Sequence, residues 1–278
     1  MSDSIRWQPR LRWTTHVLPS CLHMARQGGS ESQFGADAAL ALRELNSYVA
    51  LLSNASIVWN RAIGHAIALD VIDESASHLE ASPGSPAVSV RSIGTRLMAS
   101  GTLAEEQAAE FSERLAIAVG AIDSRLPQLA NELPARVRPL REQWEARGPG
   151  FLRALLEQPT VRTHIDPQRL PGDITVGLLH PWRGGYGEAH LADTAVSIEG
   201  LLYHADPRVP EPLRLGWLVA QVMAALAPSA DAMRGNALPI DAMLAEVMQA
   251  ARAVDWLGAD VTPEHVRRSL MIESRPQG

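Results

Sequence analysis

The sequence predicts a mainly α-helical protein with one small β-hairpin, an α+β fold built as a multi-helix globular body. Apolar residues recur at three- and four-residue steps over long stretches, as one face of a helix requires. Runs typical of strands occur only within 171–209. The composition agrees, because 46% of the 278 residues are hydrophobic and 20% are charged, which is typical of a globular chain.

The first half of the chain divides into an arm and a helical region. Residues 1–30 are expected to form an irregular N-terminal arm, because prolines and a glycine pair interrupt them. Residues 31–160 keep the helical apolar spacing. Because Pro134, Pro139 and the Gly-Pro-Gly run at 148–150 are helix breakers, we expect several short helices near the end of this region.

The second half, 171–278, is expected to form the β-hairpin and the C-terminal helices, packed with 31–160 as one domain. The runs 174–179 and 195–202 have strand composition, and a glycine-rich loop lies between them. The following segment, 213–226, is apolar on more than one face, which is typical of a central, buried helix.

Charge and composition restrict the classes of partner and compartment. The net charge is −6 and no long basic block occurs, which disfavours nucleic acid. No apolar run reaches the roughly 18 residues of a membrane span. The first residues lack a signal-peptide core, and the single cysteine, Cys21, is typical of a reducing compartment. We therefore expect a cytoplasmic protein without a membrane segment.

All 25 basic residues are arginine, so the chain contains no lysine. Schiff-base catalysis and pyridoxal phosphate attachment need a lysine amine, and a Walker A nucleotide site needs its lysine as well. The sequence therefore excludes these chemistries, and no cofactor is predicted. Cys21 has His23 nearby in sequence, but an inert thiol is the favoured interpretation.

Polar residues gather around the predicted hairpin and supply the candidate site. His190 and Glu199 are the candidate catalytic residues, and His180, Arg183 and Tyr186 are the candidate ligand-binding residues. His180 and His190 are also candidate ligands for a divalent metal, since histidine and carboxylate side chains bind such ions. The simpler alternative, which we favour, is a polar hairpin without a site.

Glu199 has two interpretations of its own. Strand alternation would turn its side chain to solvent. If the strand is covered on both sides, the carboxylate needs a partner, for which Arg183 and Arg214 are candidates.

The order of elements in 171–227, namely strand, glycine-rich loop, strand, Pro-Glu turn and buried helix, resembles the core of zincin-like metallopeptidases. Their buried helix carries a His-Glu-x-x-His motif that binds zinc. Here Trp217 and Gln221 would stand at the histidine positions and Leu218 at that of the glutamate. The resemblance therefore implies a scaffold without the zinc ligands and the base, and no family residue is carried over.

Three functions follow from these observations. A non-catalytic protein that binds a protein or a small molecule is favoured, because catalytic motifs are missing. The first alternative is a hydrolase, with or without a metal, that uses the region of His180, His190 and Glu199. The second is a subunit that assembles with copies of itself through apolar helix surfaces.

Overall fold

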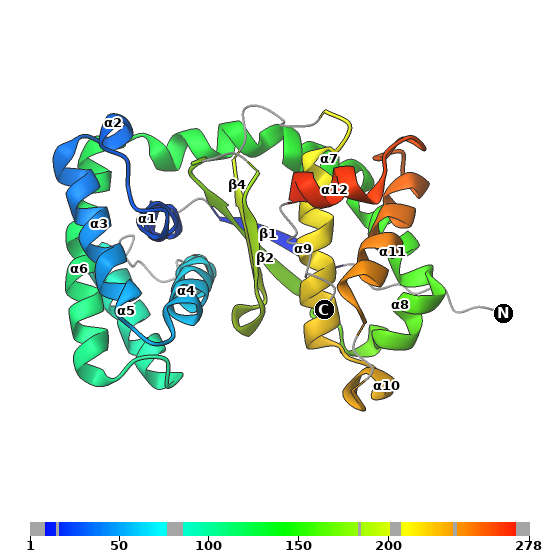
Figure 1. The fold of residues 1–278 in the computed structure, drawn as a ribbon, viewed down its shortest axis with the longest axis horizontal. Helices are drawn as coiled ribbons and strands as arrows, with labels where there is room; N and C mark the ends of the chain where they lie inside the picture. Colours follow the sequence, from blue (N-terminus) through cyan, green and yellow to red (C-terminus); the bar gives the residue numbers. More distant parts are fainter. Residues whose placement is uncertain are drawn as a thin grey trace. The chain divides into compact units, whose positions relative to one another are not determined.

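The computed structural model describes residues 9–14, 17–76, 86–182, 185–200, 207–235 and 238–270. These ranges contain twelve α-helices and four β-strands (Figure 1). The expected mainly α, α+β fold class is therefore confirmed. Within the same ranges, no helix combines the length and the apolar character that crossing a membrane requires.

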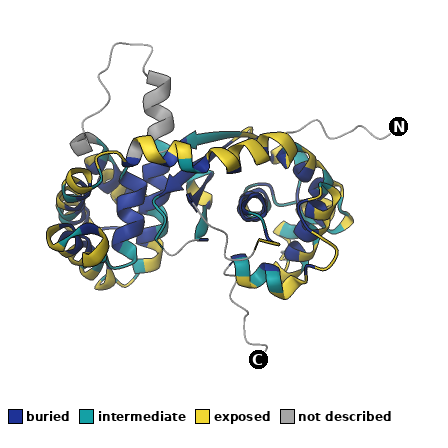
Figure 2. Ribbon diagram, turned by 90° about the horizontal axis from the view of Figure 1, so that it is seen from above, coloured by how far each residue is buried: buried dark blue, intermediate teal, exposed yellow. Residues whose placement is uncertain are grey.

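Internal contacts divide the chain into two compact units. The helical unit consists of residues 12–135 and 175–182. The C-terminal unit consists of residues 1–11, 136–174 and 183–278. In both units the buried residues lie on the inward faces of the elements and the exposed residues on the outward faces (Figure 2).

The helical unit is formed by six helices that precede α7. They are α1 (Val17–Arg26), α2 (Glu31–Phe34), α3 (Ala36–Ala50), α4 (Ala55–Ala76), α5 (Pro86–Ala99) and α6 (Glu105–Arg125). Helix α6 packs against α1, α3 and α5, and α1 also packs against α4. Fully buried side chains fill the space between them, among them Leu22, Leu42, Ile63 and Phe111. The helical periodicity of the sequence arises from this core.

The C-terminal unit is built around α9. Its helices are α8 (Pro159–His164), α9 (Glu211–Leu226), α10 (Ala230–Met233), α11 (Ile240–Ala253) and α12 (Pro263–Leu270). All residues of α9 from Glu211 to Ala220 are buried, as expected for the central helix. Gly216 makes this packing close, since a Cβ there would lie only 2.7 Å from Cε1 of Phe151. The Phe151 ring in turn stacks on Trp256, with centroids 5.1 Å apart.

One long helix, α7 (Leu129–Glu157), replaces the expected series of short ones. The prediction from Pro134, Pro139 and the Gly-Pro-Gly run is therefore wrong. Proline removes a backbone donor from a helix and costs roughly 3 kcal/mol. The helix persists because one apolar face continues past the breakers, with Trp144 and Phe151 both buried one heptad apart.

The four strands are β1 (Arg10–Thr14), β2 (Asp173–Leu179), β3 (Gly187–His190) and β4 (Ala195–Glu199). They form one sheet in the order β1-β2-β4-β3. The hairpin pairs β3 with β4 in antiparallel register, with Gly187 opposite Ile198 and His190 opposite Ala195. The strands expected at 174–179 and 195–202 are present as β2 and β4 and are neighbours in the sheet. Their direct connection as a hairpin is wrong, because β3 lies between them in sequence and was not expected as a strand.

The N-terminal prediction also needs correction. Strand β1 and helix α1 lie within residues 1–30, where an irregular arm was expected. Pro19 did not prevent the helix, because it lies in the first turn of α1, where a backbone N–H has no partner within the helix.

We predict that Phe151→Ala strongly destabilises the C-terminal unit. The ring is fully buried between α9 and Trp256, so truncation leaves a cavity that should lower the free energy of unfolding by about 3–5 kcal/mol. Chemical denaturation followed by circular dichroism measures the change. Ile117→Ala, at a side chain that is 54% exposed, should stay within about 0.5 kcal/mol of the wild type. Equal effects of the two substitutions would contradict this account of the packing.

Candidate ligand-binding pocket

A pocket of about 660 Å³ lies within the C-terminal unit. Its main wall is one face of α9, which contributes Arg214, Trp217, Leu218, Gln221 and Ala224. These residues follow each other at the three- and four-residue steps of a helix face. From the first to the last of them the wall extends roughly 15 Å, at about 1.5 Å per residue. The pocket is therefore elongated along the helix.

The opposite wall is formed by β3, which contacts α9 directly. Gly187 allows this approach, since a Cβ there would lie 2.8 Å from Cδ1 of Leu218 and 3.2 Å from the Ser197 carbonyl oxygen. Ala189 is the next small side chain along the strand that lines the pocket. Ile240 and Met243 of α11 and Leu270 of α12 supply further apolar surface.

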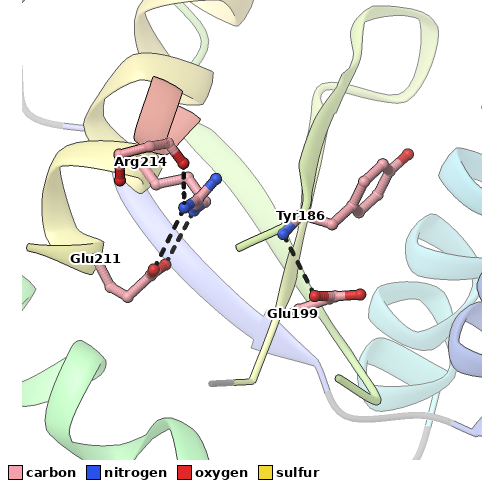
Figure 3. Close-up of polar contacts among 5 residues, drawn as sticks. Tyr186, Glu199, Glu211 and Arg214 are labelled. Atoms are coloured by element: carbon pink, nitrogen blue, oxygen red, sulfur yellow. Dashed lines mark hydrogen bonds and ion pairs between the residues drawn. The ribbon is translucent and has the colours of Figure 1, made fainter. Parts of the chain in front are cut away.

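A buried ion pair lies at one end of this pocket. The Nε of Arg214 donates to Oε2 of Glu211 at 3.1 Å, and Nη2 donates to the Ser269 carbonyl oxygen at 2.8 Å (Figure 3). Arg214 is 5% exposed and Glu211 is 8% exposed. A charge with so little solvent needs a partner of opposite sign, so each residue stabilises the other in place.

Two further polar side chains line the pocket, one from β3 and one from α8. Glu188 of β3 accepts a hydrogen bond from the hydroxyl of Tyr186. In α8, Nδ1 of His164 lies 2.7 Å from the Thr160 carbonyl oxygen. Because a carbonyl only accepts, Nδ1 of His164 is the donor in this hydrogen bond.

The candidate catalytic residues lie in the hairpin but outside the pocket lining that the described residues form. His190 is 1% exposed, and its Nε2 shares a hydrogen bond of 2.9 Å with Oγ of Ser197. Glu199 is also 1% exposed, and its Oε2 accepts from the backbone N–H of Tyr186 at 3.3 Å (Figure 3). Both side chains therefore bond within the hairpin.

The solvent-facing interpretation of Glu199 is wrong, because every residue of β4 is buried. Of the two arginines suggested as its partner, Arg214 forms its ion pair with Glu211 instead. Arg183 lies outside the described residues. The sequence suggested that Glu199 needs a partner if the strand is covered, and the backbone N–H of Tyr186 is one such partner.

The remaining candidates lie in different surroundings. His180 belongs to the helical unit, where its backbone N–H donates to Oγ of Ser20 at 2.9 Å and its ring meets the edge of Phe34. Tyr186 is not among the described residues that line the pocket, but its hydroxyl donates to Glu188, which is. Within the described ranges, no group of three or more histidine, cysteine, aspartate or glutamate side chains is arranged to hold a metal ion.

The sequence did not identify the pocket face of α9 as a site. Arg214 was considered only as a partner for Glu199, and Gln221 only as a substitute for a zinc ligand. A signal was nevertheless present, because Arg214 and Gln221 are two polar residues seven positions apart in the otherwise apolar segment 213–226. Such spacing places both on one face, next to whatever cavity the helix borders.

Comparison with protein-family models, with curated proteins and with solved structures finds no match for this chain. The resemblance of 171–227 to zincin-like metallopeptidases therefore stays a prediction. Trp217 and Gln221, the residues that this resemblance would place at the histidine positions, both line the pocket.

Cys21 generates a prediction on thiol chemistry. Its side chain is fully buried, and burial raises the pKa of the thiol from 9.0 to about 12. The difference of about 3 pH units lowers the thiolate fraction roughly a thousandfold at neutral pH. At pH 8, native protein should react with a disulfide reagent such as DTNB at least about a hundredfold more slowly than protein unfolded in guanidinium.

The same shift determines a dependence of stability on pH. Because the folded protein holds the thiol proton up to about pH 12 and the unfolded chain releases it near 9.0, the contribution is complete below the lower value and is lost between the two. Cys21→Ala should remove this part of the alkaline destabilisation. Rapid reaction of the native thiol would show that Cys21 is accessible and would contradict the buried placement.

Proposed function

We propose that this protein binds a small, elongated and mainly apolar molecule in the pocket along α9. The observation that carries the proposal is the pocket itself. Its volume of about 660 Å³ falls within the range of roughly 300–1,000 Å³ that is typical of sites for small molecules. Its walls are mainly apolar and carry a few polar groups, which is the usual composition of such sites.

The lining favours binding over catalysis. Among the described lining residues there is no serine, threonine or cysteine that could act as a nucleophile. Arg214 is held by Glu211 and Ser269. A hydrolase that uses His190 and Glu199 would require a substrate to reach two side chains that are each 1% exposed.

The proposal predicts that filling the pocket blocks binding. Ala224→Phe would place a phenyl ring inside the pocket, at the wall formed by α9. We expect it to weaken the binding of a neutral apolar fluorophore, N-phenylnaphthylamine, by about tenfold or more, which corresponds to roughly 1.4 kcal/mol. Fluorescence titration of the dye measures the dissociation constant.

The matched control is Ala245→Phe, which makes the same substitution at an exposed position of α11 outside the pocket lining. This variant should bind the dye like the wild type. A dye that does not bind the wild type, or that binds both variants equally well, would remove the support for a ligand in this pocket.

A further inference from the structure

We propose that the ligand is an aliphatic alcohol and that the side-chain amide of Gln221 in α9 binds its hydroxyl group. The inference rests on the proposed function and names the class of molecule that the pocket would take.

Gln221 projects from the middle of the pocket wall that α9 forms. Residues three and four positions apart on a helix are neighbours on the same face. Gln221 lines the pocket, and so do all four of its neighbours of this kind, namely Trp217, Leu218, Ala224 and Ala225. A side chain that is surrounded on the helix surface by pocket residues leaves the helix on the pocket side.

The amide of Gln221 has no hydrogen-bond partner among the residues that the structure describes. Its neighbours on α9 supply no acceptor, since three of them are leucine or alanine and the fourth, Trp217, carries only a donor. The side chain is half-buried, and the amide is still open to solvent. Solvent is therefore its partner until a ligand fills the pocket.

A bound molecule has to replace the water at this amide. A polar group that loses its water in apolar surroundings and gains no new partner is costly. A hydrocarbon chain cannot replace the water, so we expect a polar group of the ligand at the level of Gln221. This level lies seven residues from Arg214, roughly 10 Å along the wall at about 1.5 Å per residue.

The surroundings of Gln221 favour a hydroxyl over other polar groups. None of its four neighbours on α9 is charged, so a charged group would lose water there without gaining a counter-charge from this wall. An amide side chain both donates and accepts, and a hydroxyl does the same with a single oxygen atom. A ligand amide would bring more donors and acceptors than these apolar neighbours satisfy.

The same wall suits an aliphatic chain attached to that hydroxyl. Trp217 and Leu218 supply apolar surface one turn from Gln221 on the side of Arg214. Met243 of α11 adds apolar surface from another element. A chain that lies along α9 stays in contact with these side chains while its hydroxyl reaches Gln221.

The test compares octan-1-ol with 1-chlorooctane, in which chlorine replaces the hydroxyl on the same chain of eight carbons. Each compound displaces N-phenylnaphthylamine from wild-type protein and from Gln221→Met, after the dissociation constant of the dye itself has been measured for both. Methionine keeps the length and the helix propensity of glutamine and removes the amide. We expect the substitution to weaken octan-1-ol about fivefold relative to 1-chlorooctane, as the loss of one neutral hydrogen bond does.

The matched control is Gln249→Met, which makes the same substitution at an exposed position of α11 outside the pocket lining. This variant should leave the ratio of the two dissociation constants as it is in the wild type. Circular dichroism checks that each variant is folded. Should Gln221→Met not fold, Gln221→Leu removes the same amide and carries the same expectation.

The outcomes separate this inference from the proposed function. An unchanged ratio in Gln221→Met would overturn the assignment of the hydroxyl, even if Ala224→Phe still blocks the dye. Failure of octan-1-ol to displace a bound dye would overturn it as well. If the dye does not bind the wild type at all, the proposed function itself fails.

Discussion

Helix α9 can occupy the centre of the C-terminal unit only because two glycines leave room beside it. Gly216 lies against the Phe151 ring, and Gly187 lies against Leu218 and Arg214. A methyl group at Gly216 would overlap the Phe151 ring, and one at Gly187 would overlap the side chain of Leu218. The close approach of α7 on one side and β3 on the other fixes the position of α9, and with it the direction in which Arg214, Trp217 and Gln221 point. The pocket is a consequence of that placement.

Burying the ion pair of Glu211 and Arg214 costs free energy, because both charges lose their contact with water. Apolar side chains of similar volume often stabilise a protein as well as a buried ion pair does, or better. Glu211 lies in the first turn of α9, where a carboxylate also interacts favourably with the helix dipole. Removing either partner of this pair would leave a buried charge without its counter-charge, so the two residues hold each other in place.

The sequence predicted the features that depend on local periodicity. Local sequence patterns predicted the helical region, the central position of α9, and strands at 174–179 and 195–202, where the structure has β2 and β4. It failed where tertiary packing outweighs local propensity. Helix α7 continues through prolines because a buried face spans them, and β3 has only four residues, with a glycine at its start.

The site was the least predictable part. His190 and Glu199 attracted attention because titratable residues are conspicuous in a sequence, but both are buried, and each has a hydrogen-bond partner in the hairpin. A pocket arises from segments that are distant along the chain, here β3, α9 and α11, and no local pattern encodes their meeting. Only Arg214 and Gln221 of α9 gave a sign of it. Arg214 was read as a partner for Glu199 and Gln221 as a substitute for a zinc ligand, instead of both as one face of a cavity.

The location of the only thiol has a practical consequence. Since Cys21 lies in the core of the helical unit, the folded protein offers an almost silent background for maleimide chemistry. A cysteine placed on the outward face of α11 would then carry a spin label or a dye without first deleting the natural one. Because Met243 of the same helix lines the pocket, such a label would report on the surroundings of that wall.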